Sequence, residues 1–196
     1  MVVLALPRGG VPVAYEVARA LDAPFGVLVA RKLGVPGHEE YAMGAIAPGV
    51  FVIDKDLIRS RGLDLRTVQR VADRELHELR RREAAYLEGR EPPELRDKTV
   101  ILVDDGLATG ATMRAAAAAV RRQSPARVVV ATPVASEEAC DAFRDIVDDV
   151  ICVLTPRPFQ AVGLWYDDFT QTSDAEVRAL LARAAEARDR AAGTGT

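Results

Sequence analysis

The sequence predicts an α/β fold in which a parallel sheet is flanked by helices. Short apolar runs rich in β-branched residues alternate with stretches of helical periodicity, and Gly, Pro or charged residues bound each run. Such runs are typical of parallel strands buried on both faces, and their alternation with helices is typical of βαβ units. We therefore expect strands at Val2–Leu6, Phe25–Ala30, Val100–Val103, Val128–Ala131 and Val150–Leu154.

Helical patterns lie between these runs and predict helices at Val13–Leu21, Thr112–Arg122 and Glu137–Asp145. The segment Gly44–Ile53 places Pro-Gly between two apolar stretches, which predicts a hairpin. After the last strand, residues 155–172 are irregular and aromatic, and we expect them to form a small hood segment over the sheet end. Ser173 then caps a C-terminal helix, residues 173–192, whose first turn is acidic.

A highly charged helix, Leu65–Leu87, interrupts the strand–helix rhythm and forms a helical insertion at residues 65–89. One face carries an apolar stripe and the other faces carry Arg and Glu. Two interpretations remain open: a solvated surface helix, or a helix that leans an arginine, Arg74, Arg81 or Arg82, over an anionic ligand. In either case residues 1–172 form one α/β domain, and the C-terminal helix follows it.

Composition excludes several classes of function. The 196 residues include 29 acidic and 26 basic ones, a balance that predicts neither nucleic acid nor membrane as a partner. No apolar run reaches the length of a membrane span, and the start lacks the basic region of a signal peptide, so we expect a cytoplasmic protein. A strand-like run begins at Met1, which suggests a truncated N-terminus. Cys140 and Cys152 form no CxxC pair and are expected to be buried, reduced thiols.

The stretch VILVDDGLATGAT, residues 100–112, carries the most specific signal. Asp104 and Asp105 end a strand, so both carboxylates are expected at the C-terminal edge of the sheet, where ligands of α/β proteins bind. Glycines at 106 and 110 allow a tight loop whose N–H groups, with the start of the next helix, can hold a phosphate. A sugar between phosphate and carboxylates would separate their charges. A dinucleotide site or a phosphorylatable Asp pair fits less well, because there is no GxGxxG and the glycines follow the acids.

This stretch resembles the phosphoribosyl pyrophosphate (PRPP) motif of type I phosphoribosyltransferases, and the resemblance extends across nearly the whole chain. It implies a Rossmann-like parallel sheet with a small hood. It also implies that Asp104 and Asp105 hold the ribose hydroxyls of PRPP. The loop that would bind its 5-phosphate consists of Ala108, Thr109, Gly110, Ala111 and Thr112. Within the family the resemblance is closest to a bacterial group of predicted phosphoribosyltransferases.

A second anion site is expected in LPRGGVPVA, where Arg8, Gly9 and Gly10 lie between the first strand and its helix. The segment resembles the pyrophosphate loop of the family, which often carries a non-proline cis peptide; taken alone, an ordinary strand–helix turn also explains it. Arg31 and Lys32 are expected to close the second strand and to neutralise pyrophosphate, followed by a loop, GVPGHEEYAMGA. We expect no catalytic role for either histidine.

Aromatic residues in the hood predict a wall for a nucleobase. Phe159, Trp165 and Tyr166 could stack on the base, and Asp167 stands where purine-using members carry an acid; a hydrophobic cover over the sheet end is the alternative. Two departures leave the base open. Ala108 replaces the aspartate of enzymes for 6-oxopurines, and their base-reading lysine is missing near Val150–Pro158.

The resemblance implies transfer of ribosyl 5-phosphate from PRPP to a small nitrogenous base, with release of pyrophosphate. Asp104, Asp105, Arg8 and Lys32 would be the catalytic residues. Mg²⁺ would be the cofactor, held mainly by PRPP oxygens and water, with Asp104 or Asp105 in its outer shell. A homodimer is possible on this basis. The alternative is a PRPP- or nucleotide-sensing regulatory protein without transferase activity, which loss of the purine aspartate favours and retention of Arg8, Arg31 and Lys32 disfavours.

Overall fold

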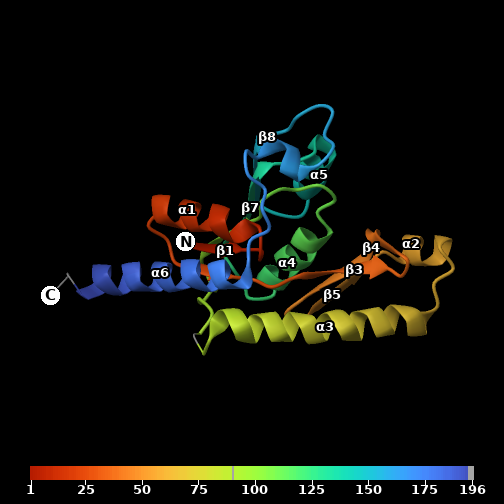
Figure 1. Ribbon diagram of the computed structural model, residues 1–196, viewed down its shortest axis with the longest axis horizontal. Coiled ribbons are helices and arrows are strands. Elements are labelled where there is room, and N and C mark those ends of the chain that lie inside the picture. Colours follow the sequence, from red (N-terminus) through yellow and green to blue (C-terminus); the bar gives the residue numbers. More distant parts are fainter. Residues whose placement is uncertain (90, 194–196) are drawn as a thin grey trace.

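A five-stranded parallel sheet forms the centre of the computed structural model, which describes residues 1–89 and 91–193 (Figure 1). The strand order is β2-β1-β6-β7-β8. Each of these strands coincides with an apolar run predicted from the sequence, and the predicted and observed ends differ by at most three residues. The predicted α/β class is therefore confirmed. The bounds are β1 Val2–Ala5, β2 Phe25–Val27, β6 Thr99–Val103, β7 Arg127–Val134 and β8 Asp149–Leu154.

Helices cover both faces of this sheet. Alternate residues of β1 face opposite ways. Val2 and Leu4 belong to one hydrophobic cluster with α4 and α5, and Val3 and Ala5 belong to the other with α1, α3 (Leu65–Leu87) and α6. Most of α4 is alanine, whose small side chain lets the helix approach the strands closely. The bounds are α1 Gly10–Ala20, α4 Ala111–Arg121, α5 Glu137–Phe143 and α6 Asp174–Gly193, and α1 and α6 lie side by side (Figure 1).

A second sheet is antiparallel, with the order β3-β4-β5. The predicted hairpin is present as β4 and β5, which turn at Gly49 with a φ of 69°. Two expectations for this region were wrong. Arg31 and Lys32 open β3 instead of closing β2, and the expected loop after them contributes to β3 and β4. The pairing of β3 with β4 is favoured because α3 covers one face of this sheet and α4 contacts the other. The bounds are β3 Arg31–Val35, β4 His38–Ala47 and β5 Val50–Ile53.

The charged insertion forms α3, Leu65–Leu87, as predicted, and runs lengthwise beside the second sheet (Figure 1). Asp64 caps its start by accepting a hydrogen bond from the Thr67 N–H at 2.6 Å. A short helix, α2 (Lys55–Ser60), precedes it, and a 3₁₀ turn, η1 (Val162–Trp165), lies in the hood. Buried residues on α3 face the core: Val68, Val71, Ala72, Leu79 and Tyr86.

The two cysteines correct another expectation, because Cys140 and Cys152 form a disulfide. Cys140 lies on the buried face of α5, and Cys152 lies on the face of β8 that packs against the same hydrophobic cluster. Only 12 positions separate them in sequence, and the packing of α5 on β8 brings them together. None of the helices in the described part of the chain is long and apolar enough to cross a membrane.

Candidate active site

A cavity of about 730 Å³ opens beside the C-terminal ends of β1 and β6. Because these strands are neighbours and parallel, the loops that follow them meet at this edge of the sheet. The rest of the wall comes from α1, β3, α3, the hood and the first turn of α6. We call it the main cavity, and its lining residues are Arg8, Gly9, Pro12, Val13, Arg31, Arg82, Asp105, Tyr166, Asp168, Phe169, Thr170, Gln171, Thr172 and Glu176.

The two acids that follow β6 have different surroundings. Asp105 lines the main cavity, whereas Asp104 does not, and its Oδ1 accepts a hydrogen bond from the Asp105 N–H at 3.0 Å. Desolvation, followed by the charge of Asp105, raises the pKa of Asp104 well above 3.8. Desolvation also raises the pKa of Asp105. Both carboxylates are thus poorly solvated, and a ligand that offers hydroxyl donors or positive charge would offset this cost.

The loop after β1 packs directly on these acids. Its Pro7–Arg8 peptide bond is cis. A Cβ on Gly9 would overlap Asp105 Oδ2, and a Cβ on Gly10 would lie 2.8 Å from both Asp104 Cα and the Val103 carbonyl oxygen. Glycine is therefore required at both positions for this close approach, which brings the expected anion loop to the acid pair.

The loop from Ala108 to Thr112 follows the acid pair on the side of β7, where Leu107 and Ala135 form an isolated β-bridge. Gly110, with a φ of 70°, precedes the first turn of α4, and a Cβ there would overlap the ring of Phe143. Thr109 and Ala111 do not line the main cavity. With Arg114 they line a second cavity of about 460 Å³, beside β4, β5 and α2. The two expected anion loops thus flank Asp104 and Asp105 but open into different cavities.

Arg31 and Lys32 point in opposite directions, because successive residues of a strand alternate between its faces. Arg31 lines the main cavity, and its Nε and Nη2 donate to Glu75 Oε2 at 2.9 and 2.5 Å. Lys32 is exposed and pairs with Ala45, on the face that contacts α4. The structure therefore brings Arg31 to the site with Arg8 and does not bring Lys32 there.

Of the three aromatic residues expected in the hood wall, Phe159, Trp165 and Tyr166, one lines the main cavity, and it does so with a ring that was not expected. Tyr166 lines the main cavity, and its hydroxyl donates to the Asp105 carbonyl oxygen at 2.6 Å. Desolvation, followed by the charges of Asp105 and Asp104, raises the Tyr166 pKa to about 12. The second lining ring is Phe169, whose centroid lies 5.2 Å from that of Tyr166. The remaining predicted hood residues, Phe159, Trp165 and Asp167, are not among the lining residues.

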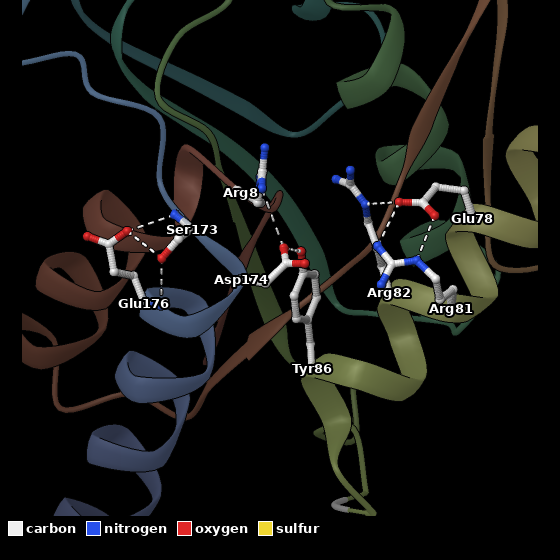
Figure 2. Close-up of polar contacts among 8 residues, drawn as sticks. All are labelled: Arg8, Glu78, Arg81, Arg82, Tyr86, Ser173, Asp174 and Glu176. Atoms are coloured by element: carbon white, nitrogen blue, oxygen red, sulfur yellow. Dashed lines mark hydrogen bonds and ion pairs between the residues drawn. The ribbon is translucent and has the colours of Figure 1, made fainter.

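Sequence reasoning missed an acid that joins three distant segments at Arg8. Asp174, the first residue of α6, accepts a hydrogen bond from the Tyr86 hydroxyl at 2.7 Å and lies 3.7 Å from Arg8 Nη1 (Figure 2). Glu75 was missed in the same way as the partner of Arg31. Charge pattern alone could not single these residues out, because α3 and α6 carry many acids and only packing selects which of them contact the arginines of the cavity.

No cluster of three or more His, Cys, Asp or Glu side chains suited to a metal ion occurs among the described residues. Mg²⁺ usually keeps several waters and binds through one or two carboxylates plus substrate phosphates. Asp105, which faces the main cavity, fits that limited role, whereas the carboxylate of Asp104 accepts from the backbone.

Comparisons with known proteins identify the family. A family model described as a phosphoribosyl transferase domain matches residues 1–166. The chain is 47% identical over 185 residues to the Mycobacterium tuberculosis (strain ATCC 25618 / H37Rv) protein named "Putative phosphoribosyl transferase Rv0571c". That match covers 94% of this chain and 42% of the relative, so the chain spans less than half of that protein's length.

A solved structure shares the fold over most of the chain. The protein TT1426 from Thermus thermophilus is similar to this chain with a TM-score of 0.78 and 42% sequence identity, over 93% of this chain and 86% of that one. The family model covers most of the chain, including both glycine-bearing loops and the acid pair. The chain therefore belongs to the phosphoribosyl transferase family.

Proposed function

We propose that the protein transfers ribosyl 5-phosphate from PRPP to a nitrogenous base and releases pyrophosphate. The observation that carries this proposal is the contact between the Arg8–Gly10 loop and the acid pair, at a cavity lined by two further arginines. Three features then follow one another along the sheet edge: the Arg8–Gly10 loop as an anion site, the acid pair as acceptors for hydroxyl groups, and the loop 108–112 as a second anion site. Pyrophosphate, ribose and 5-phosphate follow one another in the same way in PRPP.

In this proposal each part of the edge has its own task. The N–H groups of residues 108–112 and the start of α4 hold the 5-phosphate. Asp104 and Asp105 accept hydrogen bonds from the ribose hydroxyls, which offsets the cost of their desolvation. Arg8, Arg31 and the Gly9–Gly10 backbone hold the pyrophosphate. Lys32, whose side chain lies on the opposite face of β3, takes no part in this group.

The proposed reaction breaks the bond between the ribose C1 and a pyrophosphate oxygen, and the bonding electrons leave with pyrophosphate. The lone pair of a base nitrogen forms the new bond to C1, and that nitrogen releases its proton to solvent. Arginines stabilise the growing negative charge of the leaving group, while the carboxylates stabilise the positive charge on the ribose. Tyr166 and Phe169 offer the base a stacking surface.

Mg²⁺ is the cofactor in this proposal. When bound, it neutralises the charge of the pyrophosphate oxygens. Asp105 is the residue of this chain that would orient its water shell, because its carboxylate faces the main cavity. The identity of the acceptor base stays open, since residue 108 is an alanine.

Calorimetric titration of PRPP with Mg²⁺ tests this proposal on the wild type, on Asp104→Ala/Asp105→Ala and on Asp105→Asn. Asp56→Asn serves as the matched control, because the side chain of Asp56 is 96% exposed on α2. Pyrophosphate release is then followed with a panel of nitrogenous bases. We expect binding that weakens at least tenfold in the site variants, an unchanged control, and release with at least one base.

The outcomes separate the competing functions. Binding without release for any base would favour the sensing alternative over the transferase. Absence of PRPP binding by a wild-type protein that is folded would overturn both.

A further inference from the structure

Helix α3 contributes an arginine to the main cavity that belongs to none of the expected loops. Arg82 lines the cavity together with Arg8 and Arg31, although some 50 residues or more separate it in sequence from both. The Arg82 side chain is 18% exposed, so most of it is buried in the wall of the cavity. Of the three arginines that the sequence offered on this helix, Arg74, Arg81 and Arg82, it is the one that reaches the cavity.

Glu78 fixes the direction of this arginine. Arg82 Nε donates to Glu78 Oε1 at 2.7 Å, and the guanidinium extends away from α3 on the side where Arg8 lies (Figure 2). Arg81 binds the same carboxylate through Nε and Nη2, at 2.7 and 2.9 Å. These hydrogen bonds, first from Arg81 and then from Arg82, lower the pKa of Glu78 to about 2. Glu78 thus stays a carboxylate and holds Arg82 at all ordinary pH values.

The same arrangement recurs at the other two cavity arginines. Arg8 is paired with Asp174 and Arg31 with Glu75. None of the three supporting acids is among the residues that line the cavity. Each acid therefore orients an arginine from behind while part of the guanidinium faces the cavity. Three acids do line it. Asp105 belongs to the acid pair after β6, whereas Asp168 and Glu176 are each hydrogen-bonded within their own turn, to Thr170 and Ser173.

We propose that Arg82 is a third arginine ligand of the pyrophosphate group, and that Glu78 is its positioning residue. This inference rests on the proposed function, because it takes the main cavity as the pyrophosphate side of a PRPP site. Pyrophosphate carries charge on both phosphorus centres, and guanidinium groups bind such oxygens in a bidentate way. Three arginines from β3, α3 and the loop after β1 can surround it from three directions.

Titration of inorganic pyrophosphate with Mg²⁺ tests the proposal on Arg82→Ala, Arg82→Gln and Arg81→Ala. Arg81→Ala is the matched control, since Arg81 shares Glu78 with Arg82 but lies outside the cavity lining and is 51% exposed. We expect a Kd about 10- to 100-fold higher for both Arg82 variants, the loss typical of a charge-assisted contact. The control should stay within about twofold. Arg82→Gln guards against a variant that fails to fold.

The role of Glu78 has a test of its own. Glu78→Ala should weaken pyrophosphate binding when Arg82 is present and have no further effect in the Arg82→Ala background, because positioning acts only through Arg82. Additive losses in this double-mutant cycle would show that Glu78 merely stabilises α3, and would overturn its positioning role.

Arg8→Ala separates the failure of this inference from failure of the proposed function. If Arg8→Ala loses binding while both Arg82 variants match the Arg81 control, the pyrophosphate site stands and Arg82 is not part of it. If pyrophosphate binds neither the wild type nor any variant, the proposed function fails, and this inference fails with it.

Discussion

Gly9 is the residue at which the two loops of the site meet most closely. A methyl group there overlaps Asp105 Oδ2, which is the end of a flexible side chain. We therefore expect Gly9→Ala to turn the Asp105 carboxylate aside, weakening PRPP binding about tenfold or more at little cost in stability. Calorimetry for PRPP and urea unfolding of the same variant measure the two effects.

Gly10→Ala is the matched comparison for that change. Its methyl group meets the backbone of Val103 and Asp104, which cannot turn aside. This variant should lose about 1–3 kcal/mol of unfolding free energy, as overpacked positions do. An equal loss of stability in both glycine variants would contradict the distinction between side-chain and backbone contact.

Side-chain positions show where sequence reasoning reaches its limit. The pairing of Arg8, Gly9 and the acids could be predicted, because adjacent parallel strands bring the loops that follow them to one edge. The opposite orientations of Arg31 and Lys32 could not be predicted. From the sequence the two residues were expected at the end of the second strand, whereas in the structure they begin β3. Strand pairing then decided which of the two faces the cavity.

A hydrogen bond from the Tyr86 hydroxyl to Asp174 joins α3 to α6. The bond from Tyr86, followed by the charge of Arg8, lowers the pKa of Asp174 below 3.8. A lowered folded-state pKa stabilises the fold above the unfolded pKa, and this stability is lost as the pH falls through the folded value. Tyr86→Phe should therefore cost about 1–2 kcal/mol near pH 7, and less below about pH 3.8.

Urea unfolding of Tyr86→Phe at several pH values measures this dependence. Tyr15→Phe is a suitable control, because the Tyr15 ring packs edge-on against Phe25 and the ring is kept. A cost that stays the same from pH 7 to pH 3 would contradict the role assigned to the Asp174 carboxylate.

The disulfide joins α5 to β8, the strand that leads into the hood. Closing a loop of 12 residues restricts the unfolded chain and contributes about 3 kcal/mol in the chain-entropy model. Cys140→Ala/Cys152→Ala should lose about that much unfolding free energy in urea. The wild type under reducing conditions should then match the variant, whereas a variant still sensitive to reductant would contradict this account.

Periodicity predicted the elements better than it predicted their partners. The bounds of α3 follow from its apolar stripe and the Glu-Pro-Pro that follows it. The segment from Gly34 to Ala45 was wrongly expected to be a loop, because its glycines, proline and charged residues resemble a connection. It forms strands because α3 covers Leu33, Val35 and Met43, and this burial depends on a helix that comes later in the chain.

The centre of the molecule is well packed, whereas few contacts hold the hood against it. Hydrophobic clusters lie on both faces of the parallel sheet, and α3 and α4 connect it to the second sheet. None of residues 155–172, all of them described, is buried. The Tyr166 hydrogen bond to Asp105 and the contact between Val162 and Gly106 are what join the hood to the acid loop.

The hood should therefore unfold before the rest of the molecule. Segments with few buried apolar contacts open at lower free energy than a packed core. Trp165, the single tryptophan of the chain, lies in the hood and reports on it by fluorescence, while far-UV circular dichroism reports on the sheets and helices. We expect the fluorescence midpoint in urea to lie below the dichroism midpoint, and Tyr166→Phe to lower only the former. Coincident transitions in both proteins would mean that the hood unfolds cooperatively with the core.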